Sequence, residues 1–419
     1  MCKICNRVKN LFCSTKNEFD EMEAYNAKFQ NPSSSSTADK GVKAFLASYQ
    51  KWRGAVELVR PSKNGLVFGE KLYGTALIRY SACLDKGTLL TAENLRILEG
   101  ELAYFNEKTE HRFNYDEVIC FNIGLLWHKL GAEYEDYAVA AFKKYIFSTL
   151  SLSNNTAYGI NECYAFKPIT NWLYYSLMNG ELNLASPTKF NDPFDCPILQ
   201  LLESVDDDIA KLIRKAYGSS LKIGCFMSNK KLPTGDDFTD RAKHEGDAPE
   251  YLNELMWAHY ADFHKGICIK YHFESGQTIL PKSTNSVVSY FRDVKYTDGI
   301  SLLGKDGNIN MVDAFFVKSR AWEYENELRY LYFDINGSGD FQQIKILNCI
   351  SAIYFGLRCS DNDRKLIMDL MKGKKWTTVE RKRGEADKVM EHDVDFYNIV
   401  RDKKCFGKLT VEAIKQNVL

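Results

Sequence analysis

Residues 322–332 read Trp-Glu-Tyr-Glu-Asn-Glu-Leu-Arg-Tyr-Leu-Tyr, an alternation of apolar and charged side chains. A period of two predicts a β-strand with its apolar residues on one face. Glu323, Glu325, Glu327 and Arg329 would share the other face. Glu325 and Glu327 would then stand about 7 Å apart, close enough to bind one ligand and to raise one another's pKa. The alternative is a solvent-facing strand whose charged side chains pair weakly.

Other short β-prone runs surround this segment. A helix from Thr170 to Met178, ended by Gly180, separates the expected strands at Tyr164–Phe166 and Leu182–Ala185. A last helix spans about Asp363 to Met371. The second half therefore predicts an α+β domain over residues 160–419. The remaining expected strands are 223–227, 267–273, 314–317, 329–333 and 350–355.

The first half has the three-and-four spacing of amphipathic helices. Thr91 precedes one apolar stripe as its expected N-cap. The last helix pair, across Gly131, resembles a tetratricopeptide-like repeat; a plain helical bundle is the alternative. We expect a helical domain over residues 40–150, which would bind a protein partner. The expected helices lie near residues 42–59, 72–80, 92–105, 118–130 and 137–147.

Composition sets the class of protein. The chain has 419 residues, with 55 Lys and Arg against 55 Asp and Glu, and 45% hydrophobic residues. This profile predicts a soluble globular protein of two or three domains, and its zero net charge gives little support to whole-molecule attraction to nucleic acid or membrane. No signal-peptide core or membrane-length apolar run occurs, so we expect a cytoplasmic protein without membrane contact.

The first 39 residues are expected to form a leader and linker, ending in the polar tract Asn31-Pro32-Ser33-Ser34-Ser35-Ser36-Thr37. Cys2 and Cys5 are half of a zinc site and lack a second pair, so no metal is expected there. The twelve cysteines, without repeated spacing, indicate reduced thiols.

Five blocks in the second half carry a family resemblance, and they cover about residues 164–372. This region resembles domain of unknown function family 2971 (DUF2971). The blocks are Gly180-Glu-Leu-Asn-Leu-Ala-Ser-Pro-Thr-Lys-Phe-Asn-Asp-Pro-Phe-Asp195, Cys225-Phe-Met-Ser228, Met256-Trp-Ala-His-Tyr-Ala-Asp-Phe-His-Lys-Gly-Ile-Cys268, Trp322-Glu-Tyr-Glu-Asn-Glu-Leu-Arg329 and Ile353-Tyr-Phe-Gly-Leu-Arg358.

The Glu-x-Glu pair on a strand is similar to that of mono-ADP-ribosyltransferases, which cleave the nicotinamide–ribose bond of NAD. The resemblance implies that Glu327 holds the ribose and stabilises an oxocarbenium-like transition state, while Glu325 orients or deprotonates the acceptor. Lys167 stands where that fold commonly places Arg or His, and it lacks the planar fork of Arg.

The segment from Trp257 to Gly266 predicts a short helix that turns into the 267–273 strand. His259 and Tyr260 resemble the residue types of the His-Tyr-Glu variety of the transferases, although their order differs. His259 and His264 are five residues apart, which does not make the metal-binding pair of a helix. We expect His259 and Tyr260 to be catalytic with the two glutamates. The expected cofactor-binding residues are Tyr164, Lys167, His264 and Arg329.

Taken together, the sequence favours an NAD-dependent ADP-ribosyltransferase-like effector that modifies a protein or nucleic-acid target, as in a bacterial toxin or in antiphage defence. A non-enzymatic peptide- or nucleotide-binding module is the alternative. A metal-dependent nuclease, with Asp192, Asp195 and the two glutamates as ligands, is a lesser alternative. The Lys- and Arg-rich tail from Lys372 to Lys408 would be a solvated face or would guide a target.

Overall fold

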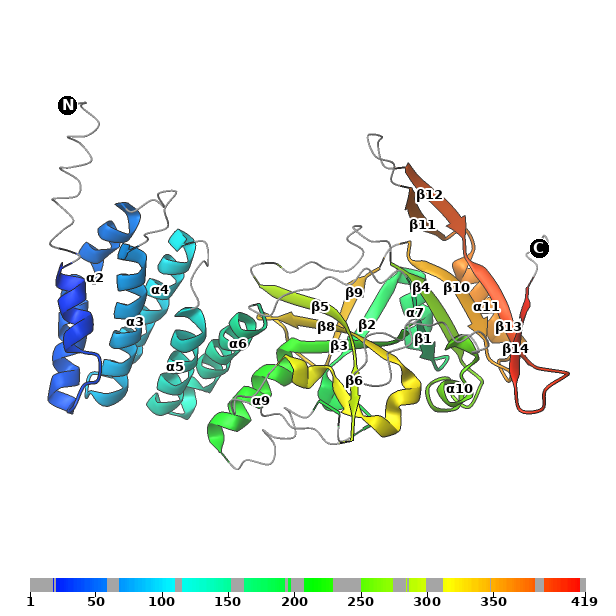
Figure 1. Ribbon diagram of the computed structural model, residues 1–419, viewed down its shortest axis with the longest axis horizontal. Helices are drawn as coiled ribbons and strands as arrows, with labels where there is room; N and C mark the ends of the chain where they lie inside the picture. The colour runs from blue at the N-terminus through cyan, green and yellow to red at the C-terminus, as the bar shows by residue number, and fades with distance from the viewer. Residues whose placement is uncertain are drawn as a thin grey trace, which may run out of the picture. The chain divides into compact units, whose positions relative to one another are not determined.

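The α+β class expected from the sequence is confirmed by the computed structural model (Figure 1). Contacts divide the chain into two compact units, residues 1–152 with 202–217 and residues 153–201 with 218–419. The structure describes residues 18, 20–58, 68–109, 115–151, 162–192, 195–196, 207–228, 250–273, 284, 286–298, 312–346, 348–380 and 388–414.

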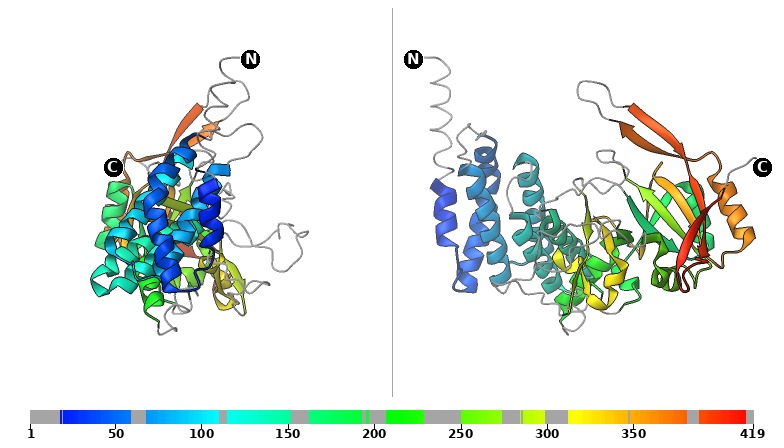
Figure 2. Two further views of the ribbon diagram at one scale, coloured as in Figure 1. Left: turned by 90° about the vertical axis from the view of Figure 1, so that its left-hand side faces the viewer. Right: turned by 45° about the vertical axis from the view of Figure 1, so that its right-hand side comes forward.

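The first unit is helical, and its helices lie side by side (Figures 1 and 2). As expected, Thr91 precedes α4, and its hydroxyl accepts the Asn94 N–H at 3.2 Å. Gly124 lets α5 and α6 approach closely, since a Cβ there would stand 2.6 Å from Phe142. The helices are α2 (Ser35–Leu58), α3 (Phe68–Lys86), α4 (Ala92–Thr109), α5 (Tyr115–Leu130), η1 (Ala132–Tyr134) and α6 (Glu135–Ser151).

Part of the expected leader belongs to this helical unit. Residues 20–28 are helical, and Met22, Tyr25 and Phe29 are buried. Only residues 31–34 of the polar tract form a turn, and the tract's last three residues are the start of α2, which begins at Ser35. Aromatic contacts explain the difference, because Tyr25 lies 5.3 Å from Trp52 between ring centroids. Cys2 and Cys5, like most of the segment between the two expected domains (residues 150–160), lie outside the described residues.

The second unit is built on a ten-stranded sheet of described residues. Its order is β14-β13-β10-β4-β1-β3-β2-β9, and β8 pairs with β3 and β5. Along one edge of β3, β1 pairs with Met227 and Ser228, whereas β2 pairs at Ile223. The strands are β1 (Glu162–Lys167), β2 (Glu181–Ala185), β3 (Leu221–Ser228), β4 (Ile267–His272), β5 (Val287–Asp293), β8 (Glu327–Asp334), β9 (Phe341–Lys345), β10 (Ile350–Phe355), β13 (Asp395–Arg401) and β14 (Leu409–Ala413).

Both faces of this sheet carry an apolar core, because successive side chains of a strand point to opposite faces. In β1, Cys163 and Ala165 pack with the residues of α7 and α11, whereas Tyr164 and Phe166 pack with those of α10. The strand β8 is buried on both faces, and this explains why five of its eight residues are apolar or aromatic in a nearly unbroken run. The covering helices are α7 (Asn171–Asn179), α11 (Asp361–Met371) and α10 (Glu254–Tyr260).

The strand–helix–strand unit expected after Tyr164 is confirmed. Thr170 caps α7 by accepting the Leu173 N–H, and Gly180 ends it in the left-handed conformation with φ 63°. Only glycine adopts that conformation without a steric cost, so the chain turns at once into β2.

Three further expectations differ from the structure. The expected strand at 314–317 is instead the 3-10 helix η4 (Asp313–Phe315), followed by the short strand β7 (Val317–Ser319). The 322–332 segment is a strand only from Glu327, since the 3-10 helix η5 covers Arg320–Glu325. Beyond residue 372, the charged tail contributes β13 and β14 to the sheet and forms the hairpin of β11 (Lys375–Glu380) and β12 (Lys388–Asp393) (Figure 2). The sequence pattern does not indicate these strands, because β12 and β14 contain no buried residue, β11 contains only Thr377, and β13 contains only Phe396 and Ile399.

Candidate functional site

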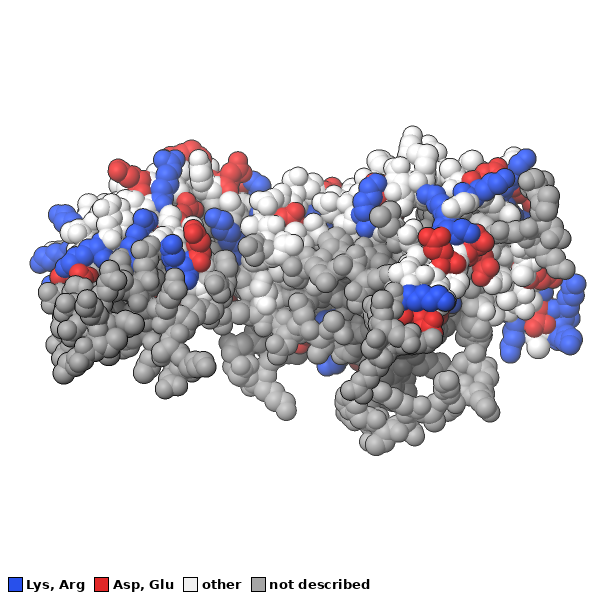
Figure 3. All heavy atoms as spheres, turned by 90° about the horizontal axis from the view of Figure 1, so that it is seen from above, with Lys and Arg blue, Asp and Glu red and all other residues white. Residues whose placement is uncertain are grey.

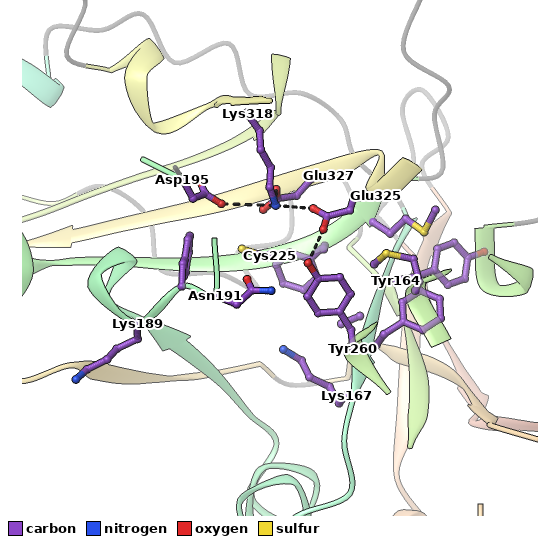
Figure 4. A pocket seen from close by; sticks show the side chains of 16 residues that line it. Tyr164, Lys167, Lys189, Asn191, Asp195, Cys225, Tyr260, Lys318, Glu325 and Glu327 are labelled. Atoms are coloured by element: carbon purple, nitrogen blue, oxygen red, sulfur yellow. Dashed lines mark hydrogen bonds and ion pairs between the residues drawn. The ribbon is translucent and has the colours of Figure 1, made fainter. Parts of the chain in front are cut away.

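A pocket of about 280 Å³ opens in the second unit, at the part of β3 between its contacts with β1 and β2. Cys225 of β3, Lys167 of β1 and Tyr260 of α10 are among its lining residues. Lys318, Glu325 and Glu327 line it as well. Figure 4 shows the carboxylates of Glu325, Glu327 and Asp195 around Lys318, with Lys167 and Lys189 further away. The pocket therefore has an acidic cluster facing two lysines.

A single left-handed residue brings both glutamates to the pocket. Glu325 ends η5, Asn326 adopts φ 41° and ψ 52°, and Glu327 begins β8. Asparagine tolerates this conformation better than most side chains. Its side-chain amide also donates to Ser228 O at 2.9 Å, which fastens the turn to the end of β3. The two carboxylates meet in the pocket as expected, although a turn and not a continuous strand places them.

Lys318 bridges the two carboxylates. Its ammonium donates to Glu325 Oε2 at 2.6 Å and to Glu327 Oε2 at 3.3 Å. It also lies 3.6 Å from Asp195 Oδ2. Lys318 belongs to β7 (Val317–Ser319), which pairs with β6 (Lys295–Thr297) outside the main sheet.

Arg329 lies behind Glu327 and is completely buried. Its Nε donates to Glu327 Oε1 at 2.8 Å and its Nη2 to Glu327 Oε2 at 2.9 Å, which is a bidentate pair. Nη2 also donates to Asp195 Oδ2 at 2.8 Å. Arg329 was expected to bind a cofactor, but it does not line the pocket and instead holds the carboxylates that do.

The pKa values of the two glutamates are shifted in opposite directions. Burial raises the pKa of Glu325 above its usual range, even though Lys318 opposes this effect. Burial would also raise the pKa of Glu327, but Arg329 and Lys318 outweigh it and lower the pKa of Glu327 to about 2. Glu327 is thus a permanent carboxylate, while Glu325 is the group that can exchange a proton.

Tyr260 and Lys167 complete the polar lining. The Tyr260 hydroxyl donates a short hydrogen bond to Glu325 Oε1, and burial raises the pKa of Tyr260. Burial lowers the pKa of Lys167, whose ammonium has no hydrogen bond or ion pair within the described part of the chain. Tyr164 also lines the pocket. The structure therefore brings Tyr164, Lys167, Tyr260, Glu325 and Glu327 together around one space.

The two histidines lie elsewhere. His259 is exposed, and its Nδ1 pairs with the Tyr324 hydroxyl at 2.8 Å. His264 stacks on Trp257 with 6.3 Å between ring centroids, and burial lowers its pKa. Neither lines the pocket, because successive residues of α10 point in different directions and His264 lies in the turn that follows.

Sequence reasoning missed Lys318 as a site residue, and it weighed Asp195 only as a metal ligand. Lys318 stands in a three-residue strand without a local motif, so only the folded chain reveals its partners. Asp195 and Cys225 lie in two of the blocks of the DUF2971 resemblance, which was the available signal. Among the described residues, no group of three or more His, Cys, Asp or Glu side chains could hold a metal ion. The Lys318 ammonium occupies the space between the carboxylates.

Residues 256–330 match the model of a family described as protein of unknown function (DUF2971). This confirms, over those residues, the family resemblance expected from the sequence. The matched segment includes Tyr260, Lys318, Glu325 and Glu327 of the pocket. Nothing among curated proteins and nothing among solved structures matches the chain. None of the helices in the described ranges has both the length and the apolar character that a membrane span requires.

Proposed function

We propose that this pocket binds NAD and cleaves its nicotinamide–ribose bond, transferring ADP-ribose to a macromolecular acceptor. The observation that carries the proposal is that two neighbouring carboxylates in one pocket have different partners: Arg329 and Lys318 hold Glu327, whereas Lys318 and the Tyr260 hydroxyl hold Glu325. Burial accordingly raises the pKa of Glu325, while the two cations lower that of Glu327. Such a divergence separates a proton-transfer group from a permanently charged one. Cleavage of a glycosidic bond needs both.

Glu327 is suited to stabilise the positive charge that develops on the ribose, because it remains ionised at any physiological pH. The buried cluster has three carboxylates, Asp195, Glu325 and Glu327, and two cations, Lys318 and Arg329. It therefore presents one more negative than positive charge. Lys167 and Lys189 also line the pocket, so this excess is confined to the side of the acidic cluster, where it favours a cationic pyridinium or oxocarbenium group.

Glu325 is suited to take a proton from the attacking group, since its pKa lies above that of an exposed glutamate. The Tyr260 hydroxyl orients this carboxylate through their hydrogen bond. Lys167, on the opposite side of the pocket, has free donors for an anionic or carbonyl oxygen of the dinucleotide (Figure 4).

The acceptor would be a protein or a nucleic acid in the cytoplasm, and the helical unit would bind a protein partner. A role as a bacterial toxin or antiphage effector follows from analogy alone. On the face displayed in Figure 3, basic and acidic side chains of the described residues lie next to one another.

The test is incubation of the purified chain with radiolabelled NAD and cell lysate. Glu325→Gln and Glu327→Gln should each lower label transfer by about 10²–10⁴-fold, because each removes one of the two chemical roles. Glu323→Gln is the matched control, since Glu323 lies in the same segment but is exposed. Equal labelling by Glu327→Gln and wild type would remove Glu327 from the mechanism.

A non-enzymatic binding module is the second candidate. The observation in its favour is that the three carboxylates of the cluster are already paired with Lys318 and Arg329 without a ligand. A fully paired cluster holds its side chains in fixed positions, as a binding surface requires. Calorimetry with NAD separates the two functions. A folded wild type that binds a nucleotide or peptide without consuming NAD would support the binding module.

A further inference from the structure

Lys318 occupies the centre of the acidic cluster, yet nothing in its sequence neighbourhood predicts a role. Its side chain is 5% exposed, and its ammonium lies 4.9 Å from the centroid of the Trp322 ring. The ring of Trp322 and the three carboxylates therefore surround it. A lysine buried in this way is held in one position, so the atoms that it contacts are held as well.

We propose that Lys318 is a positioning residue of the pocket, whose ammonium holds the carboxylates of Glu325 and Glu327 toward the same ligand. Its catalytic consequence rests on the proposed function, whereas its effect on the carboxylates does not. Glu327 is also held by Arg329. For Glu325, Lys318 is the cation that contacts it among the described residues. Glu325 therefore depends on Lys318 more than Glu327 does.

The geometry of an ammonium suits this position. Lys318 has three donors that can reach carboxylates in different directions, and two of them are directed at Glu325 and Glu327. A guanidinium is planar and larger, and its fork favours one carboxylate at a time. Arginine at this position would keep the charge while loosening the bridge between the two glutamates.

Removing the Lys318 charge should keep Glu325 protonated at higher pH. Lys318 lowers the pKa of Glu325 both by its charge and by its hydrogen bond, while burial and Glu327 raise it. Glu327 would remain ionised because Arg329 stays in place. The other titratable and charged groups that face the two glutamates and Lys318 are Lys167, Lys189, Asp195, Cys196, Cys225, Tyr260, Tyr296, Tyr324 and Arg329.

The experiment is a ¹³C-carboxyl NMR titration of the full chain, in which Glu325→Gln identifies the Glu325 signal. Lys318→Met should raise the measured pKa of Glu325 by about 1–3 pH units, as expected for loss of a neighbouring opposite charge. Lys318→Arg should raise it less. Lys295→Met is the matched control, because Lys295 lies on the paired strand β6 and is exposed. An unchanged Glu325 titration in folded Lys318→Met would overturn the proposal.

The double variant Lys318→Met/Glu325→Gln addresses folding. It removes both charges of the pair. At a pH above the raised pKa of Glu325 in Lys318→Met, the double variant should unfold at a higher temperature than Lys318→Met alone, since the uncompensated buried carboxylate is gone. Equal unfolding temperatures of the two variants would contradict the pairing. This comparison gives a result even if Lys318→Met is too unstable for NMR.

NAD turnover separates this proposal from the proposed function. If the wild type is active, Lys318→Met should shift the acidic limb of its kcat–pH profile to higher pH, by the same amount as the pKa of Glu325. Lys318→Arg should be more active than Lys318→Met. A purely structural role would lower the rate equally at all pH values, and that outcome counts against the proposal. If the wild type consumes no NAD but Glu325 shifts as expected, the proposed function fails and Lys318 keeps its positioning role.

Discussion

Glu325 and Glu327 are separated by one residue, yet their surroundings differ sharply. Glu327 has a bidentate arginine and a lysine, whereas Glu325 has the lysine and the Tyr260 hydroxyl. Two cations outweigh the cost of burial for Glu327, and one does not for Glu325. The chemical difference between two identical side chains therefore comes from the number of positive charges near each.

The lowered pKa of Glu327 predicts a loss of stability in acid. Its pKa falls from 4.5 to about 2 on folding, so its contribution is complete above pH 4.5 and is lost as the pH falls toward 2. Across that window, the unfolding free energy of the wild type should fall by about 3 kcal/mol more than that of Glu327→Gln. Urea unfolding at pH 5, 4, 3 and 2 measures this difference. Glu323→Gln should follow the wild type, and parallel curves for Glu327→Gln would contradict the assignment.

Arg329 should contribute more to the free energy of unfolding than Arg292, which lies opposite it on the neighbouring strand β5. Arg329→Leu leaves the buried carboxylates of Glu327 and Asp195 without their main partner, which should lower the unfolding free energy by about 3–5 kcal/mol. Arg292→Leu is the control, because Arg292 lies opposite Arg329 in the β5–β8 register but is partly exposed and pairs with Asp313. It should cost about 0–1 kcal/mol. Equal urea midpoints for the two variants would contradict the role of Arg329.

At the level of elements, the turn between α10 and β4 places Tyr260 and Lys167 on the same pocket. Asp262, Phe263 and His264 all have positive φ, a conformation that costs non-glycine residues about 1–2 kcal/mol each. Backbone hydrogen bonds within the turn offset this cost, such as that from Gly266 N to Ala261 O at 2.7 Å. The turn brings Gly266 against the carbonyl of Lys167, at the end of β1.

Gly266→Ala should therefore disturb both the turn and the pocket. A Cβ at this position would stand 2.2 Å from Lys167 O, and that backbone atom cannot easily move away. We expect a loss of about 1–3 kcal/mol in unfolding free energy. Gly100→Ala is the control, and it should raise the unfolding free energy. No atom lies within 4 Å of the Cβ position of Gly100 in helix α4, and alanine is more favourable than glycine in a helix by about 1 kcal/mol. Equal unfolding temperatures for the two variants would contradict the close contact.

On the scale of the whole chain, each of the two units is formed by two separate stretches of sequence. Residues 202–217 group with the N-terminal helices, although they follow the first two strands of the other unit. The contact of Lys215 with Glu135 at 2.9 Å is part of this grouping. The sequence expectation of one boundary near residue 150 did not foresee the return of the chain, because α9 (Asp208–Ser220) has an ordinary amphipathic pattern that does not specify which surface it packs against.

This arrangement predicts a local effect of cutting the chain after residue 152. In the isolated fragment 153–419, amides of residues 208–217 should exchange hydrogen at least about tenfold faster than in the full chain, because their helical neighbours are absent. Amides of β8 should keep their protection and serve as the internal control. Mass spectrometry of peptides from both samples measures the rates. Unchanged exchange at 208–217 would show that α9 does not need the first unit.

Local patterns were sufficient for much of the architecture. Apolar stripes indicated α2 to α6, Thr170 and Gly180 marked the ends of α7, and β-prone runs located most strands of the sheet's centre. Each of these features depends on residues that are close in the chain, because helix spacing, caps and strand alternation are local properties. The proximity of Glu325 and Glu327 was also expected, but from a continuous strand, whereas the left-handed turn at Asn326 between η5 and β8 produces it.

The pocket required contacts between distant parts of the chain. Pairing of β3 with β8 joins residues about a hundred positions apart, and it sets Glu327 across from Met227. Lys318 and Asp195 reach the glutamates from a separate two-stranded sheet and from a turn, and neither has a periodic pattern that reveals its direction. Which carboxylate gains or loses its proton depends on burial and on the number of neighbouring cations, and these exist only once the chain has folded.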